Sequence, residues 1–179
     1  KRIGVVNTIV NRGGKLFGYN TDFAGFLYNL NAHDITLKDK KVMICGSGGT
    51  CKTVTAVAEY MGAKEILVVS RSKKENTVTY EECIRHKDVD VIVNASPNNG
   101  ESPLDLSNFP NCKAVVDVIY NPLKTRLLQQ AEQLGMKAVN GLEMLVAQAK
   151  FAVEHFLSTE IDSQADHPCC VQAKLCGLS

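Results

Sequence analysis

The sequence predicts an α/β fold: a doubly wound parallel sheet with helices on both of its faces. Two features of residues 41–157 lead to this prediction. Short apolar stretches alternate with stretches whose apolar residues recur at helical spacing. The short stretches are apolar throughout, which is typical of strands buried on both faces of a parallel sheet. A strand that rejoins its sheet in parallel needs a crossover, and the intervening helices supply it.

Each stretch of this region has a predicted place in the alternation. The apolar runs are predicted strands, at residues 41–45, 66–69, 89–93, 114–118 and 137–139. The predicted helices are one with Val54, Val57, Ala58 and Met61 on one face and a stop at Gly62, a weak one at 77–85, one from Pro122 to a stop at Gly135, and a long one at 142–157.

The residues before this region predict a hairpin and a helix. A strand at 3–10, a turn at 11–14 and a strand at 15–19 follow one another closely enough to pair. Thr21 is expected to cap the next helix. The apolar face of that helix would consist of Phe23, Phe26, Leu27 and Leu30.

These patterns divide the chain into three parts. Residues 1–40 form the leading hairpin and helix, residues 41–157 form the sheet domain, and residues 158–179 form a tail that we expect to be poorly ordered. Three of the seven cysteines lie in this tail. The seven cysteines together are odd in number and irregularly spaced, without a CxxC pair, which disfavours a disulfide framework or a zinc site.

Composition narrows the class of protein. Of the 179 residues, 45% are hydrophobic and 22% are charged, and the net charge is +1. This near balance disfavours a protein that binds nucleic acid or a membrane surface through a basic excess. The chain also shows no run long enough to span a bilayer and no signal peptide. We therefore expect a cytoplasmic protein, either monomeric or homodimeric, without a metal.

A glycine-rich stretch predicts where a ligand binds. The residues Gly46-Ser47-Gly48-Gly49-Thr50-Cys51 lie between the first predicted strand of the sheet and its helix. A Rossmann-like fold places its GxGxxG loop there, and the start of the helix then holds a pyrophosphate. The alternative is a glycine loop that forms only a tight turn. The predicted strand and helix on either side favour binding by Gly46, Ser47, Gly48, Gly49 and Thr50.

The end of the next strand predicts which dinucleotide binds. NAD sites usually have an acidic residue there, which accepts a hydrogen bond from the ribose. This chain instead has Ser70, Arg71 and Ser72, and an arginine can form paired hydrogen bonds with a phosphate. The sequence therefore predicts NADP rather than NAD. Lys73 and Lys74 are equally compatible with a phosphate contact and with a solvated loop.

Five motifs occur in an order that resembles the shikimate dehydrogenase family. They are GVVNT at 4–8, GYNTD at 18–22, NASP at 94–97, DVIYNP at 117–122 and NGLEMLV at 140–146, and the glycine loop is similar to the same family's GAGG form. The resemblance implies NADP-dependent reduction of 3-dehydroshikimate to shikimate, in chorismate and aromatic amino acid biosynthesis. Phe23 and Glu143 stand where that family has glycine.

The resemblance also implies roles for individual residues. Asp22 would be one half of a catalytic Asp–Lys pair, because reducing a ketone needs a proton for the oxygen. Taken alone, Asp22 is better explained as complementing the dipole of its helix, and the surrounding Asn20-Thr21-Asp22 motif reverses that preference. The substrate would contact Asn7, Asp22, Tyr120 and Gln148. The nicotinamide cofactor would also meet Asn94, Ala95, Ser96, Val118 and Gly141.

One expectation concerns the rest of the family's fold. Members of the family carry an N-terminal substrate domain with the catalytic lysine, and no lysine here matches it. We therefore expect this chain to bind NADP without turning over by itself. Two alternatives stay open: a quinate/shikimate-type dehydrogenase with relaxed cofactor or substrate use, and a non-catalytic NADP-binding regulatory domain. A third is an interaction module whose glycine loop is only structural.

Overall fold

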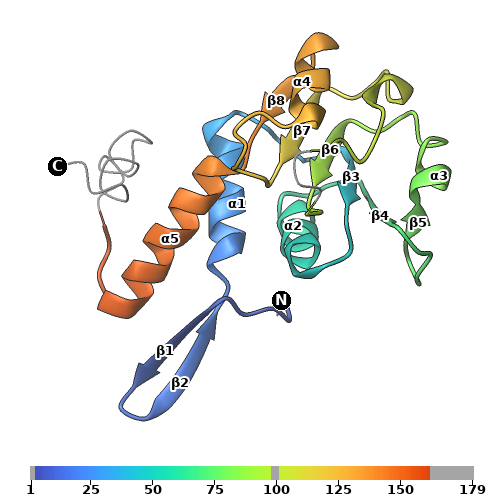
Figure 1. Ribbon diagram of the computed structural model, residues 1–179. Helices are drawn as coiled ribbons and strands as arrows, with labels where there is room; N and C mark the ends of the chain where they lie inside the picture. The colour runs from blue at the N-terminus through green and yellow to red at the C-terminus, as the bar shows by residue number, and fades with distance from the viewer. Residues whose placement is uncertain (1–2, 98–100, 162–179) are drawn as a thin grey trace.

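The computed structural model describes residues 3–97 and 101–161 (Figure 1). Its centre is a six-stranded sheet in the order β5-β4-β3-β6-β7-β8, with every neighbouring pair parallel. This sheet confirms the predicted doubly wound α/β fold. Its strands are β3 (Lys41–Cys45), β4 (Glu65–Ser70), β5 (Val78–Thr79), β6 (Val91–Asn94), β7 (Ala114–Asp117) and β8 (Lys137–Val139).

Helices cover both faces of the sheet because alternate strand residues face two separate cores. In β3, Val42 and Ile44 belong to one core, while Met43 and Cys45 belong to the other. The first core packs against α1 (Thr21–Ala32), α2 (Gly49–Tyr60) and α5 (Leu142–Leu157). The second packs against α3 (Tyr80–Cys83), the 3₁₀ helix η1 (Leu106–Asn108) and α4 (Arg126–Gln133).

The predicted hairpin is present and projects from the sheet domain (Figure 1). Its strands are β1 (Thr8–Arg12) and β2 (Lys15–Tyr19), joined by Gly13 and Gly14, whose positive φ angles suit a tight hairpin turn. The hairpin rests on α5, where the rings of Tyr19 and His155 stack with centroids 3.8 Å apart.

Two details of this region differ from the prediction. The first strand begins at Thr8 rather than at residue 3, because Gly4 has a φ of +76° and interrupts the extended backbone. The N-cap of α1 is Asn20, whose side chain accepts from the backbone N–H of Phe23 at 3.0 Å. Thr21 is the first helical residue instead.

The stretch at 77–85 was predicted as one helix and is a strand followed by a short helix. Val78 and Thr79 pair with the end of β4 and form the edge strand β5. Thr79 then caps α3 through a capping box with Glu82, so the helix cannot begin earlier. The apolar residues of this short segment recur at helical spacing, and that pattern did not reveal the two-residue edge strand.

The helix predicted to start at Pro122 starts at Arg126. Thr125 is its N-cap, and the Thr125 hydroxyl also donates to the buried carboxylate of Asp117 at 2.7 Å. The preceding Asn121–Pro122 peptide bond is cis. Residues 118–124 form the loop between the end of β7 and this cap.

The C-terminal boundary of α5 agrees with the prediction, since Ser158 ends the helix in a left-handed conformation. Most of the predicted tail, with Cys169, Cys170 and Cys176, lies outside the described residues. Within residues 3–97 and 101–161, none of the helices combines the length and apolar character that a bilayer span requires.

Candidate nucleotide and substrate site

The candidate site lies where the strand order of the sheet reverses. From β3 the chain proceeds to β4 and β5 on one side, and from β6 to β7 and β8 on the other. Ligands of open α/β sheets bind in the crevice at the carboxyl ends of the strands at such a point. Here Gly46 follows β3 and Ala95 follows β6, and the Ala95 N–H donates to the Cys45 carbonyl at 2.8 Å.

The glycine loop has the shape that a phosphate needs. Gly46 has a φ of +113°, and a Cβ atom on it would lie 2.8 Å from the Ala95 carbonyl oxygen, so a side chain does not fit. Nothing lies within 4 Å of the position of a Cβ atom on Gly48. Gly48 is also the N-cap of α2 and offers no side-chain cap. Gly48 and Gly49 are exposed, so the start of α2 is open to solvent, and the start of a helix is a place where an anion can bind.

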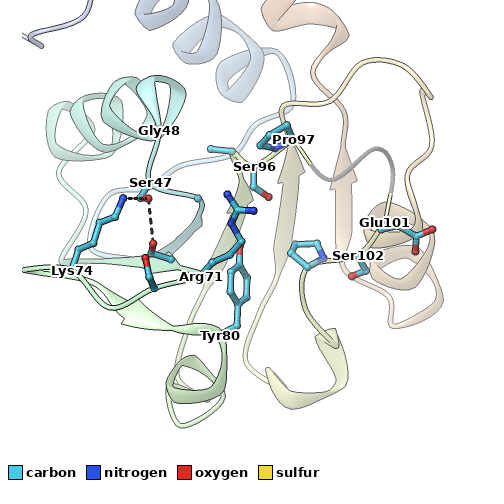
Figure 2. A pocket seen from close by; sticks show the side chains of 14 residues that line it. Ser47, Gly48, Arg71, Lys74, Tyr80, Ser96, Pro97, Glu101 and Ser102 are labelled. Carbon is cyan, nitrogen blue, oxygen red and sulfur yellow. Dashed lines mark hydrogen bonds between the residues drawn. The ribbon is translucent and has the colours of Figure 1, made fainter.

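A cavity of about 650 Å³ opens beside this loop (Figure 2). It is in the size range of small-molecule sites. Eight of the predicted cofactor residues line it: Gly46, Ser47, Gly48, Ser70, Arg71, Ser72, Ala95 and Ser96.

The cations at the mouth of this cavity differ in their partners. Arg71 is exposed and forms no hydrogen bond or ion pair within the described residues. Lys73 turns away, with its ammonium 2.6 Å from the carboxylate of Glu82. Lys74 lines the cavity and donates to the Ser47 hydroxyl at 3.1 Å. The structure thus separates two lysines that the sequence left equivalent.

Sequence reasoning missed Tyr80, which lines the same cavity. Figure 2 shows its ring beside the side chain of Arg71. Burial raises the pKa of the Tyr80 hydroxyl to about 12, although a hydrogen bond with Ser96 opposes the shift. The hydroxyl is therefore a neutral donor and acceptor. The signal that could have located it is the Thr79–Glu82 capping box, which fixes the start of α3 at Tyr80.

Other predicted cofactor residues do not line this cavity. Asn94 is fully buried, and its side-chain oxygen accepts from the N–H of Ser96 at 3.1 Å and from its hydroxyl at 2.7 Å. Asn94 therefore positions Ser96 rather than lining the cavity. Gly49, Thr50, Val118 and Gly141 do not line it either.

Gly141 has a packing reason to be glycine. A Cβ atom on it would lie 2.0 Å from the Val118 carbonyl oxygen, so the loops after β7 and β8 touch at this position. Two residues later, a carboxylate oxygen of Glu143 lies 3.6 Å from Nδ1 of His33 at the end of α1. These contacts join the start of α5 to both β7 and α1.

The buried Asp117 side chain stabilises the ends of β6 and β7 and the loop after β7 by hydrogen bonds. The Asp117 carboxylate accepts from the side-chain amide of Asn94 at 2.9 Å, from the N–H of Ile119 at 3.1 Å and from the hydroxyl of Thr125. Burial raises its pKa, and these hydrogen bonds oppose the shift. Asp117 thereby connects β6, β7 and the cap of α4.

Three of the four predicted substrate residues, Asn7, Asp22 and Gln148, gather around the start of α1. The Asn7 side chain accepts from the Thr21 N–H at 2.9 Å and donates to its hydroxyl at 3.1 Å. The Thr21 hydroxyl lies 3.4 Å from the side-chain oxygen of Gln148 on α5. This approach is possible because Gly25 lets the two helices touch: a Cβ atom there would lie 2.7 Å from the Met144 carbonyl oxygen.

Asp22 belongs to this polar cluster and Tyr120 does not join it. Burial raises the pKa of the Asp22 carboxyl, while a hydrogen bond from Asn7 opposes the shift. Tyr120 is 47% exposed in the loop after β7 and forms no hydrogen bond with Asn7, Thr21 or Gln148. The Asn20 side chain donates to the Thr53 hydroxyl at 3.2 Å, which anchors the cluster to α2.

Nowhere in residues 3–97 and 101–161 do three His, Cys, Asp or Glu side chains gather as metal ligands would. Cys45, Cys51, Cys83 and Cys112 are buried and unpaired thiols.

Curated relatives and solved structures that are similar to this chain lead to the same family. No family model matches the chain. The shikimate dehydrogenase (NADP(+)) of Clostridium beijerinckii is 35% identical over 178 residues, which cover 92% of this chain and 66% of the relative. The one from Alkaliphilus oremlandii is 35% identical over 93% of this chain and 67% of its own length. The chain thus spans about two thirds of the length of these curated relatives.

Solved structures match over nearly the whole chain. A chorismate mutase/shikimate 5-dehydrogenase fusion protein from Clostridium acetobutylicum has a TM-score of 0.89 at 33% identity, covering 99% of this chain and 70% of that one. Shikimate 5-dehydrogenase from Thermus thermophilus, solved in complex with NADP(H) and shikimate, has a TM-score of 0.82 at 31% identity, covering 96% and 69%.

Proposed function

This chain belongs to the shikimate dehydrogenase family, and from that premise we propose that it binds NADP in an oxidoreductase that interconverts 3-dehydroshikimate and shikimate. The proposal includes the wider role that the family implies, in cytoplasmic chorismate and aromatic amino acid biosynthesis. One observation carries it. At the end of β4, where an NAD site presents an acid, this chain presents the guanidinium of Arg71, which has no ion-pair partner among residues 3–97 and 101–161, beside an open glycine loop.

The cavity residues divide the cofactor between them. The N–H groups at the start of α2 would hold the pyrophosphate, since the start of this helix is open to solvent. Ser70, Arg71 and Ser72 would hold the 2′-phosphate by charge-assisted hydrogen bonds. Bound NADP supplies or accepts the hydride. The protein's contribution is to orient it and to keep its phosphates in place.

The polar cluster at the start of α1 would bind the substrate. Asn7, Thr21 and Gln148 present amide and hydroxyl groups that match the hydroxyls of shikimate. Asp22 would hold or move the proton at the reacting oxygen. Its raised pKa supports this role because a partly buried carboxyl keeps its proton to a higher pH.

Shikimate-dependent formation of NADPH tests this function in the full natural polypeptide that carries this sequence. We expect NADP⁺ reduction by shikimate, and Asp22→Asn should slow it by about a hundredfold or more. Phe23→Leu, next to Asp22, is the matched control and should change the rate far less. Reduction with quinate as fast as with shikimate would favour the relaxed dehydrogenase. NADP⁺ binding without turnover would favour the regulatory domain and contradict the proposal.

A further inference from the structure

We propose that Thr21 is a positioning residue of the substrate site, because its buried hydroxyl fixes which atoms of the Asn7 and Gln148 amides face the substrate. The inference rests on the proposed function and refines it: Thr21 acts through its two neighbours rather than by touching the substrate. Thr21 is the first residue of α1 and is only 1% exposed. It lies where α1 packs along α5, and Asn7 comes just before β1 (Figure 1).

The orientation of the Asn7 amide follows from the backbone of Thr21. The Thr21 N–H, which can only donate, lies 2.9 Å from the side-chain oxygen of Asn7. The side-chain nitrogen of Asn7 is therefore the atom beside the Thr21 hydroxyl, and the hydroxyl oxygen accepts from it at 3.1 Å. The same nitrogen carries a second N–H, and the Asn7 side chain also hydrogen-bonds to the Asp22 carboxyl. One amide thus links the buried hydroxyl to the acid that would hold the proton.

The orientation of the Gln148 amide follows from its own helix. The Leu145 carbonyl, which can only accept, lies 3.0 Å from the side-chain nitrogen of Gln148. The side-chain oxygen of Gln148 is therefore the atom that faces Thr21, 3.4 Å from its hydroxyl. The second N–H of the Gln148 amide stays free, so Gln148 can offer a hydrogen-bond donor to a substrate hydroxyl.

The Thr21 hydroxyl has one proton and two acceptors within reach. The side-chain oxygens of Asn7 and Gln148 both lie 3.4 Å from it. The Asn7 oxygen already accepts from the Thr21 N–H, and also from the Thr8 hydroxyl at 3.3 Å. The Gln148 oxygen has no other donor in the described part of the chain, so the proton is best used there. The hydrogen bonds then run in one direction, from Asn7 through Thr21 to Gln148.

A fixed direction matters because a side-chain amide can turn over and exchange its donor and acceptor ends. Without the Thr21 hydroxyl, the Gln148 oxygen would lose its donor, and either end of that amide could face the substrate. Asn7 would keep the hydrogen bond from the Thr21 N–H and would therefore stay in place beside Asp22. We expect the loss to fall mainly on substrate binding and less on proton transfer.

Steady-state kinetics of the full natural polypeptide test this role, with shikimate and NADP⁺ varied separately. Thr21→Val keeps the shape of the side chain and removes the hydroxyl. It should raise the KM for shikimate about tenfold, change kcat less than about threefold and leave the KM for NADP⁺ within about twofold. Thr21→Ser keeps a hydroxyl and should hold the KM for shikimate within about threefold of wild type. Thr21→Ala repeats the loss of the hydroxyl with a smaller side chain.

Two further variants separate positioning from stability. Gln148→Met removes the amide that Thr21 would orient, so adding Thr21→Val to it should raise the KM for shikimate no further. Val57→Ala truncates a fully buried residue of α2 that belongs to the hydrophobic core. It should lower the midpoint of urea denaturation and leave the KM for shikimate within about twofold of wild type.

The outcomes separate this inference from the proposed function. A KM for shikimate that is unchanged in both Thr21→Val and Thr21→Ala would overturn the positioning role alone. A serine variant as impaired as the valine variant, or full additivity with Gln148→Met, would also overturn it. Wild-type polypeptide that does not reduce NADP⁺ with shikimate would overturn the proposed function, and this inference with it.

Discussion

Lys41 and Arg71 lie at opposite ends of the parallel sheet, and they differ in whether acidic side chains pair with them. At the amino end, the Lys41 side chain is 11% exposed and its ammonium lies 3.0 Å from Glu65 and 3.1 Å from Asp88. At the carboxyl end, Arg71 faces an open cavity with no acidic partner in the described residues. At the amino end the charge of Lys41 is paired within the protein, whereas at the carboxyl end the charge of Arg71 is accessible to a ligand.

The pKa of Lys41 shows what the closed cluster achieves. Burial alone lowers it, but hydrogen bonds to Glu65 and Asp88 outweigh burial and raise it. The Lys41 charge is thus satisfied inside the protein. Arg71 has no such compensation from the described part of the chain, which leaves its charge open to solvent or to a ligand. We therefore expect Lys41 to serve the fold and Arg71 to serve binding, as proposed.

Removing the buried Asp117 carboxylate at the carboxyl end of the sheet should have the largest effect on stability. Asp117→Ala would leave the Asn94 amide, the Ile119 N–H and the Thr125 hydroxyl without an acceptor. We expect a loss of about 3 kcal/mol in the free energy of unfolding, measured by urea denaturation. A loss below about 0.5 kcal/mol would show that this network does not hold the strand ends together.

Arg71→Ala should produce the largest effect on binding. Losing charge-assisted hydrogen bonds to a phosphate should cost about 2 kcal/mol, or about thirtyfold in the Kd of NADP⁺. The free energy of unfolding should stay within about 0.5 kcal/mol of wild type, since Arg71 is exposed. Calorimetric titration checks the first and urea denaturation the second. A variant that unfolds more easily but binds normally would reverse the roles assigned to the two ends.

Lys41→Ala should behave in the opposite way. We expect it to lower the free energy of unfolding by about 1 kcal/mol, because the carboxylates that lose their partner are partly exposed. The Kd of NADP⁺ should remain within about twofold of wild type. Lys40→Ala, which removes the neighbouring half-buried lysine and its 3.7 Å ion pair with Asp90, is the control. Weaker NADP⁺ binding in Lys41→Ala alone would break the comparison.

A dependence of stability on pH gives the smallest expected effect. The pKa of Asp117 is raised in the folded state above its ordinary value of 3.8, so its contribution to stability is complete below that pH and declines as pH rises through the folded pKa. Asp117→Asn cannot ionise. The unfolding free energy of this variant relative to wild type should therefore rise between roughly pH 4 and pH 7. A constant difference across this range would contradict the raised pKa.

Much of the fold follows from local sequence patterns. The β3 run and the glycine loop after it were predicted at their positions, because a strand that is apolar throughout has a strong signal. The edge strand at Val78 and Thr79 was not, because two residues carry no pattern and depend on pairing with β4. The start of α4 was missed because the Thr125 cap also hydrogen-bonds to Asp117 at the end of β7, a tertiary contact that the local pattern does not show.

The candidate site was predictable where the backbone defines it. Gly46 and Gly48 were identified from the loop, and Arg71 from its place after β4. The direction of a lysine side chain was not predictable, because Lys73 and Lys74 differ only in which neighbour the loop turns them toward. Tyr80 was likewise hidden, since its approach to Arg71 depends on tertiary structure.

The ratio of the NADP⁺ and NAD⁺ dissociation constants of this chain tests the central claim most directly. An open glycine loop with the Arg71 guanidinium beside it should bind NADP⁺ at least about tenfold more tightly than NAD⁺ at moderate ionic strength, and added salt should reduce the ratio. Equal affinities for the two nucleotides, or no binding of either, would contradict it.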